Sequence, residues 1–266
     1  MKNLKYFLCL AIAFFLTPNF VFAQVGDIDE DGFEVVGETT KYYKTVTVYS
    51  NSGTSTQSTN GDPEVLSTIT YEIPKIVYDA VDPNAINNYS INASTTVETT
   101  YKEMTTYLLA NGSYYRYRNI LFWKVIPATR QYDIIGIGFY ASVKPKNNTL
   151  YFTQKYTQSG TQHTSTTHVP QIFSNGASAT FRLPTSTNVT ALEQTFYFDV
   201  EKTDASSTII NQIACGDYAH ATTSSNGLLN ALMHEVIGTA GIVHTGSISS
   251  QYDAISVAQV NWSGSW

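Results

Sequence analysis

The stretch from Ser113 to Val143 shows a strong alternation of residue types along the chain. Two runs rich in β-branched and aromatic residues flank a four-residue turn that Pro127 opens. Such runs around a short turn are typical of a β-hairpin, so we predict two paired central strands here. In the second strand, alternate residues form a wholly apolar face: Ile135, Ile137, Phe139, Ala141 and Val143.

The opposite face of this second strand is thinned by Gly136 and Gly138. Glycine inside a strand often marks the close approach of another part of the chain. We therefore expect a bulky group to pack against the two glycines, with Phe122 and Trp123 as the candidates nearby in sequence. Asn111-Gly112 is a tight-turn dipeptide that joins a preceding strand to the hairpin. The segment Thr95–Val143 is thus predicted to be a three-stranded antiparallel meander.

Similar runs recur along the chain at roughly 10- to 15-residue spacing, with turn residues between them. This spacing favours an all-β, mainly antiparallel fold, either a β-sandwich or a barrel-like single domain. One short helix is predicted near the C-terminus, over Asn226–Ile237, because its leucines and valine follow helical spacing and Gly238 can end it. The other predicted strands are Thr39–Ser50, Val65–Ile73, Ser94–Leu109, Leu150–Gln158, Thr161–Val169, Ala177–Leu183, Thr195–Lys202 and Tyr252–Trp262.

The first 23 residues have a different character. Lys2 and Lys5 precede a short apolar run, and the segment ends in a small residue, Ala23. This order is typical of a secretory signal peptide, and the run is short for a membrane-spanning helix. We predict a signal peptide over residues 1–23, an acidic leader over residues 24–38 and a single β-rich domain over residues 39–266. The expected location is secreted or extracellular, with no stable transmembrane anchor after the signal is removed.

Removal of this segment leaves 13 Lys and Arg against 21 Asp and Glu, a net charge of −8. Such acidity disfavours binding to nucleic acids or to anionic membranes. It also leaves a single cysteine, Cys215, so no internal disulfide can form. The core alone must then stabilise the fold.

The acidic leader contains a pattern that resembles the EF-hand calcium loop. Oxygen-bearing residues stand at loop positions 1, 3, 5 and 12, and Gly32 stands at position 6. By this resemblance the calcium ligands are Asp27, Asp29, Asp31 and Glu38. The entering helix of an EF-hand has no room before Asp27 in the mature chain. The alternative is therefore a solvated acidic tail.

A second pattern, His234-Glu235-Val-Ile-Gly238-Thr-Ala-Gly241-Ile-Val-His244, resembles the zinc-protease motif of the metzincins. The resemblance implies zinc ligation by His234 and His244 and general-base chemistry by Glu235. Gly238 replaces the second histidine of that motif, which leaves two ligands where a catalytic zinc site uses three. Zinc is not expected on that ground, and a buried helix followed by a turn of small residues is the alternative.

Two further segments contain residue types that can carry chemistry. Cys215, Asp217 and His220 are the elements of a thiol hydrolase, but they lie within six residues, whereas such sets usually come from distant segments. The polar strands between Leu150 and Val169 lack the apolar face that a membrane-inserting hairpin needs.

These observations favour a secreted, non-catalytic β-rich protein that binds an extracellular ligand or protein of unknown identity. Tyr114, Tyr115 and Tyr117 could supply rigid contacts to it or pack within the sheet. The alternatives are a secreted hydrolase that uses the degenerate zinc-protease-like motif and, third, a β-pore-forming toxin. No cofactor is expected; the solvated acidic tail is the favoured interpretation of the leader, and a calcium site is the alternative.

Overall fold

The structure is a computed structural model of the 266-residue chain. It describes residues 24–50, 64–85, 89–92, 95–223, 227–245, 249, 251–253, 255–264 and 266. Residues 1–23 and their predicted signal peptide lie outside the described part. No helix among the described residues is long and apolar enough to cross a membrane.

A nine-stranded antiparallel sheet forms one layer of the fold. Its main path runs β2 (Glu64–Ile73), β1 (Glu34–Ser50), β4 (Thr95–Asn111), β5 (Tyr114–Val125), β12 (Val189–Lys202), β8 (Tyr151–Gln158) and β9 (Thr161–Ser165). Two short strands extend it: β3 (Tyr89–Asn92) pairs with β4, and β7 (Val143–Pro145) pairs with β12.

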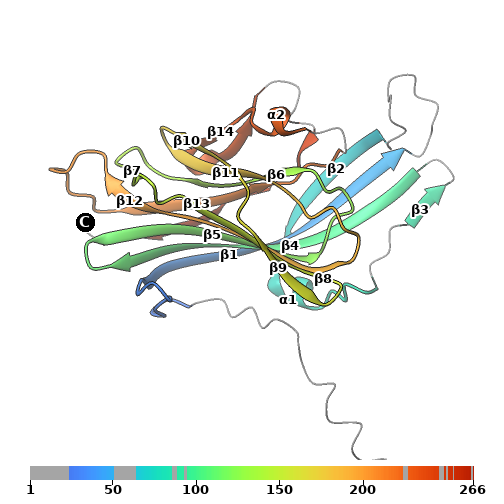
Figure 1. The fold of residues 1–266 in the computed structure, drawn as a ribbon, viewed down its shortest axis with the longest axis horizontal. Helices are drawn as coiled ribbons and strands as arrows, with labels where there is room; N and C mark the ends of the chain where they lie inside the picture. The colour runs from blue at the N-terminus through green and yellow to red at the C-terminus, as the bar shows by residue number, and fades with distance from the viewer. Residues whose placement is uncertain are drawn as a thin grey trace, which may run out of the picture.

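A five-stranded antiparallel sheet forms the second layer, in the order β10 (Val169–Phe173), β11 (Gly176–Arg182), β6 (Tyr132–Gly138), β13 (Gln212–Ala219) and β16 (Ala258–Trp262). The two sheets stack with the main core between them (Figure 1). Met104 and Leu121 enter this core from the first sheet, and Ile135 and Ala179 enter it from the second. The predicted all-β, mainly antiparallel, sandwich-like fold is confirmed.

A two-stranded hairpin covers the outer face of the five-stranded sheet (Figure 1). It consists of β14 (His234–Ile237) and β15 (Gly241–His244), joined by the 3₁₀ turn η1 (Gly238–Ala240). Its backbone and side chains occupy the space that the glycines of β6 leave free. A Cβ added to Gly136 would lie 3.2 Å from Val236 Cγ2, and one added to Gly138 would lie 1.8 Å from the carbonyl oxygen of Gly238. The expected close packing is present, but Phe122 and Trp123 do not provide it.

The predicted hairpin between the two central strands is wrong. β5 belongs to the nine-stranded sheet and β6 to the five-stranded sheet, so the chain crosses between layers after Val125. β5 instead pairs with β4 on one side and β12 on the other. Both strands have an inward apolar face, and this alternation is the same whether two strands pair or face each other across a core.

The helix predicted over residues 226–237 is much shorter. The α-helix α2 spans only Leu228–Ala231, and the chain then enters β14 at His234. In a segment this short, the spacing of Leu232, Val236 and Ile237 does not separate a helix from a turn followed by a strand. Another short helix, α1 (Lys75–Asp79), was not predicted.

Candidate functional site

The acidic residues of the predicted leader form a turn that packs against the nine-stranded sheet. Asp29 accepts hydrogen bonds from the backbone N–H groups of Asp31 (3.0 Å) and Phe33 (2.9 Å), which forms a tight turn. Strand β1 starts directly after it, at Glu34, inside the predicted leader. Glu38 therefore lies on an extended strand, where burial raises the pKa of its carboxyl group.

Two arginines of β5 neutralise the carboxylates of this turn. Arg116 contacts Asp31 at 2.5 Å and Asp199 at 2.8 Å, and Arg118 contacts Asp29 at 3.4 Å. The Arg116 guanidinium also lies 4.3 Å from the centroid of the Phe33 ring. Across the described ranges, no three His, Cys, Asp or Glu side chains form a group able to hold a metal ion. Asp29 and Asp31 are therefore paired with arginines in this structure.

The residues of the zinc-protease-like pattern lie on the β14–β15 hairpin. His234 and His244 are directly opposite each other in its register, with ring centroids 6.2 Å apart. Glu235 is exposed while its neighbours His234 and Val236 are buried, because alternate side chains of a strand point to opposite faces. The structure therefore brings the two histidines together and directs Glu235 away from them.

Each of the two histidines is held by groups of the protein interior. His234 shares hydrogen bonds with the Ser178 hydroxyl (2.9 Å) and the Ala231 carbonyl (2.8 Å), and burial lowers its pKa. His244 stacks on Tyr252 with ring centroids 4.1 Å apart. Burial, assisted by the nearby His234, lowers the pKa of His244 to about 4. Two neutral imidazoles in a packed hairpin fit a structural role.

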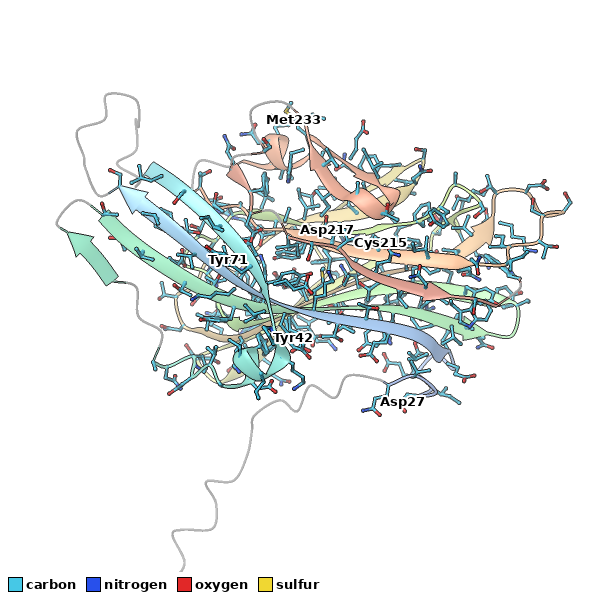
Figure 2. All side chains as sticks on the ribbon, turned by 180° about the vertical axis from the view of Figure 1, so that it is seen from behind. Asp27, Tyr42, Tyr71, Cys215, Asp217 and Met233 are labelled. Carbon is cyan, nitrogen blue, oxygen red and sulfur yellow. The ribbon has the colours of Figure 1, made fainter. Side chains whose placement is uncertain are left out.

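Cys215, Asp217 and His220 do not form a catalytic group. All three are buried, and Figure 2 labels Cys215 and Asp217 on β13. Cys215 and Asp217 share one face of β13, whereas Tyr218 belongs to the alternate set and packs in the main core. His220 follows the strand, and its ring centroid lies 5.2 Å from that of Trp123. Burial raises the pKa of the Cys215 thiol to about 12, so the thiol is protonated at neutral pH and a weak nucleophile.

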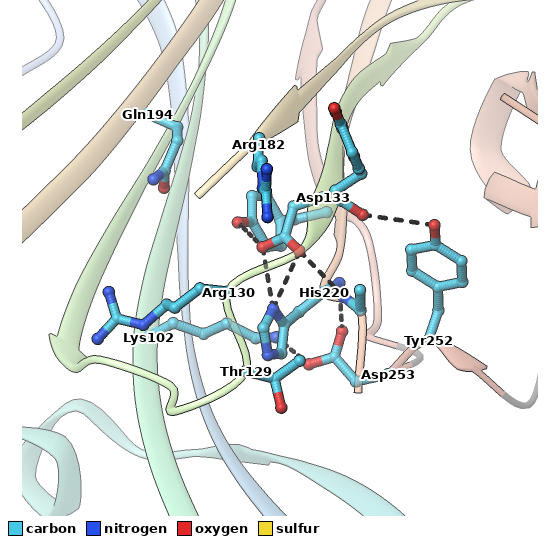
Figure 3. A network of polar contacts seen from close by, with 12 residues as sticks. Lys102, Thr129, Arg130, Asp133, Arg182, Gln194, His220, Tyr252 and Asp253 are labelled. Carbon is cyan, nitrogen blue, oxygen red and sulfur yellow. Dashed lines mark hydrogen bonds and ion pairs between the residues drawn. The ribbon is translucent and has the colours of Figure 1, made fainter. Parts of the chain in front are cut away.

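A buried polar cluster, which was not among the predicted sites, lies between the two main sheets (Figure 3). It contains Lys102 from β4, Asp133 from β6, His220 just after β13, and Asp253 from the segment before β16. Lys102 Nζ contacts the Asp253 carboxylate, and the exposed fractions of the two side chains are 1% and 0%. Two opposite charges are therefore removed from water together.

The Asp133 carboxylate organises the second half of this cluster. It accepts hydrogen bonds from the Tyr218 hydroxyl (2.5 Å) and the Ala221 backbone N–H (3.0 Å), and it lies 2.9 Å from His220 Nδ1. The backbone N–H of His220 in turn donates to Asp253 Oδ1 at 2.8 Å. These bonds join β6, the end of β13 and the segment at Asp253 into one network.

One signal for this cluster was present in the sequence. Asp133 shares the alternating face of Ile135, Ile137 and Phe139, and a carboxylate on an apolar face requires a buried partner. Lys102 gave no comparable signal, because a lysine on a strand is usually exposed.

The surface also offers an edge strand with apolar side chains. β2 ends the path of the nine-stranded sheet and pairs with β1 along one side. Ile69 and Tyr71 share a face of β2 and are 51% and 50% exposed. Tyr71 is labelled on this outer part of the sheet in Figure 2. Of the three tyrosines named as possible contacts, Tyr114 is exposed, whereas Tyr115 and Tyr117 pack in the core.

No protein-family model and no curated protein matches the chain. Among solved structures, the chain is similar to the collagen-binding domain of the Erysipelothrix rhusiopathiae surface protein RspB, with 6% identity and a TM-score of 0.27 over 66% of this chain and 72% of that one. The major pilin subunit BcpA of Bacillus cereus gives 10% identity and a TM-score of 0.31 over 70% and 65%. A collagen-binding domain of a Staphylococcus aureus adhesin gives 8% and 0.23 over 41% and 85%. Scores this low transfer neither a fold nor a function.

Proposed function

We propose that the chain is a secreted, non-catalytic interaction protein that binds an extended segment of an extracellular protein partner. The observation that carries this proposal is the edge strand β2. Its main-chain groups on the side away from β1 have no strand partner among the described residues. An extended peptide can pair with such an edge through main-chain hydrogen bonds.

The side chains of β2 support the same function. Natural proteins usually protect an exposed edge with charges, prolines or a covering element. The middle of β2 instead presents Ile69 and Tyr71, each about half exposed, while Glu72 at its end is paired with Lys41 at 2.8 Å. Apolar side chains on alternate positions give a paired peptide its specificity. Secretion rests on the pattern of residues 1–23.

Peptide selection can test this function. A phage-displayed library of random peptides is panned on residues 24–266, and the affinities of the enriched peptides are measured. We expect Ile69→Lys and Tyr71→Lys to weaken their binding by about tenfold or more, a loss of roughly 1.4 kcal/mol. Ile172→Lys is the matched control, since Ile172 is 59% exposed on β10, an edge strand of the other sheet. Binding that survives both β2 variants would contradict the proposal.

A further inference from the structure

The contact between Lys102 and Asp253 is fully buried in the core. Lys102 Nζ lies 4.9 Å from the centroid of the Trp123 ring and 5.5 Å from that of Tyr218. Asp253 is the hydrogen-bond partner that the described residues provide for this ammonium group. A buried ion pair carries a desolvation cost for both charges, which their attraction often fails to offset.

A covalent bond between the two groups would remove that cost. Condensation of an amine with a carboxylic acid replaces two charges by one neutral amide. Both reactants are already in contact, and a fixed contact makes the reaction effectively unimolecular. The surrounding Trp123 and Tyr218 rings limit the access of water, which would otherwise solvate both charges.

We propose that Lys102 and Asp253 condense into an intramolecular amide bond between Nζ and Cγ, with the loss of one water molecule. A proton first passes from the Lys102 ammonium to Asp253 Oδ2. The neutral amine attacks Cγ, and the electron pair of the Cγ=Oδ1 bond moves to Oδ1. Oδ2 then leaves as water with a second proton from Nζ, and Oδ1 regains its double bond. An ammonium and a carboxylate thus give one amide and one water, without an oxidant or a reductant.

Neighbouring groups are placed to assist these steps. The His220 backbone N–H donates to Oδ1 at 2.8 Å, the atom on which negative charge develops during attack. A fixed donor at that atom stabilises the tetrahedral intermediate. The Thr45 hydroxyl lies 3.4 Å from Oδ2, the oxygen that leaves. Asp133 is a positioning residue, because its bonds to the His220 ring and the Ala221 N–H hold the donating backbone in place.

Mass spectrometry of purified residues 24–266 under denaturing conditions tests the bond. We expect an intact mass lower than the sequence mass by one water, about 18 Da. Proteolysis should release a branched peptide that joins the segments around Lys102 and Asp253. The branched peptide separates this reaction from the dehydration of an aspartate alone. Wild-type protein at its full sequence mass would overturn the proposal.

Three variants make the test specific. Lys102→Arg keeps the positive charge and Asp253→Ala removes the carboxyl group, and both chains should have their full mass. Asp253→Asn should instead lose ammonia, about 17 Da, because its side-chain amide nitrogen is the leaving group. Tyr252→Phe is the neighbouring control and should lose water as the wild type does. A loss of water that persists in Lys102→Arg would refute the assignment even if the wild type shows it.

Discussion

Asp217 joins two layers of the molecule through one carboxylate. Its Oδ2 accepts a hydrogen bond from the Ile242 N–H of the outer hairpin at 2.6 Å, and its Oδ1 accepts one from the Tyr218 N–H at 2.7 Å. The side chain is buried, and burial raises its pKa from 3.8 to about 7 against the opposing effect of these two bonds. The hairpin is thus attached to β13 by a group that titrates near neutral pH.

Asp217→Asn should change how stability depends on pH. Because the folded-state pKa is raised, the folded protein keeps a proton between about pH 4 and 7 that the unfolded chain has lost. The contribution of Asp217 is therefore full below pH 4 and lost as the pH rises to 7, by about 1.4 kcal/mol per unit. Chemical denaturation at several pH values should show a shallower decline for the variant. Burial also raises the pKa of Glu103 to about 7, but Glu103 is present in both chains and cancels in the comparison. Equal slopes would contradict this account.

The buried charges were the residues that sequence patterns could least predict. Lys102 stands in an ordinary alternating strand, and its partner Asp253 is 151 positions away. Alternation reports which face a residue occupies, but it does not report what meets that face from a distant segment. Burial of a lysine depends on such a meeting.

Among the elements, β6 and the outer hairpin depend on each other most directly. Gly136 and Gly138 leave the outer face of β6 open, and the β14–β15 hairpin fills it. The same hairpin has its own glycine requirement at Gly241, where φ is +73° and a Cβ would lie 2.1 Å from Asp217 Oδ2. Because β6 and the hairpin both have glycines at their contact, the hairpin can pack close to the five-stranded sheet.

Gly138→Ala should destabilise the fold strongly, by about 1–3 kcal/mol, the usual cost of overpacking. Its Cβ would overlap the Gly238 carbonyl, which is backbone and can move only with the whole η1 turn. Gly136→Val should also destabilise, because the nearest side-chain atoms already lie within 3.3 Å of a Cβ there. Gly227→Ala is the control, since its Cβ would have no atom within 4 Å among the described residues beyond its chain neighbours. Urea denaturation measures all three, and an unchanged midpoint for Gly138→Ala would show that the hairpin does not pack as described.

The elements also show where local patterns are sufficient. β4, β5 and their Asn111-Gly112 turn follow from alternation and turn chemistry, and the structure pairs them as an antiparallel hairpin. Local patterns failed for β13, a central strand of the second sheet, because Cys215-Gly216-Asp217 interrupts its apolar run. They failed again at residues 232–237, where packing on the glycines of β6 favours a strand.

At the scale of the whole molecule, contacts between distant segments join the turn at residues 29–33 to the nine-stranded sheet, and the nine-stranded sheet to the five-stranded sheet. Arg116 holds Asp31 of the turn and Asp199 of β12, while Thr39 of β1 donates to the Gln259 carbonyl of β16 at 2.8 Å. The class of fold was predictable because many strands each supplied evidence for it. The division of those strands between two sheets was not, since it depends on contacts between distant segments.

Thermal denaturation should show no rise in melting temperature when millimolar Ca²⁺ is added. Arg116 and Arg118 already neutralise Asp29 and Asp31, and a ligand raises the melting temperature only if it binds the folded state. A Ca²⁺-induced rise in melting temperature that disappears in the double variant Asp27→Ala, Asp29→Ala would instead establish the EF-hand-like site.

Arg116→Gln should lower the melting temperature, because charged hydrogen bonds contribute about 1.5–3 kcal/mol each.

The long separation between Lys102 and Asp253 has a consequence for the order of events in synthesis. Until the ribosome has produced Asp253, a compact core would enclose Lys102 beside Trp123 and Tyr218 without its counterion. Such a partly closed state is unfavourable, because a lone buried charge is very costly. The Ser256 carbonyl, which accepts a hydrogen bond from the Tyr43 hydroxyl 213 positions away, is synthesised after Asp253. The nascent chain should therefore stay open until Asp253 has been synthesised, so the core closes only after the strands β1 to β13 have all been made.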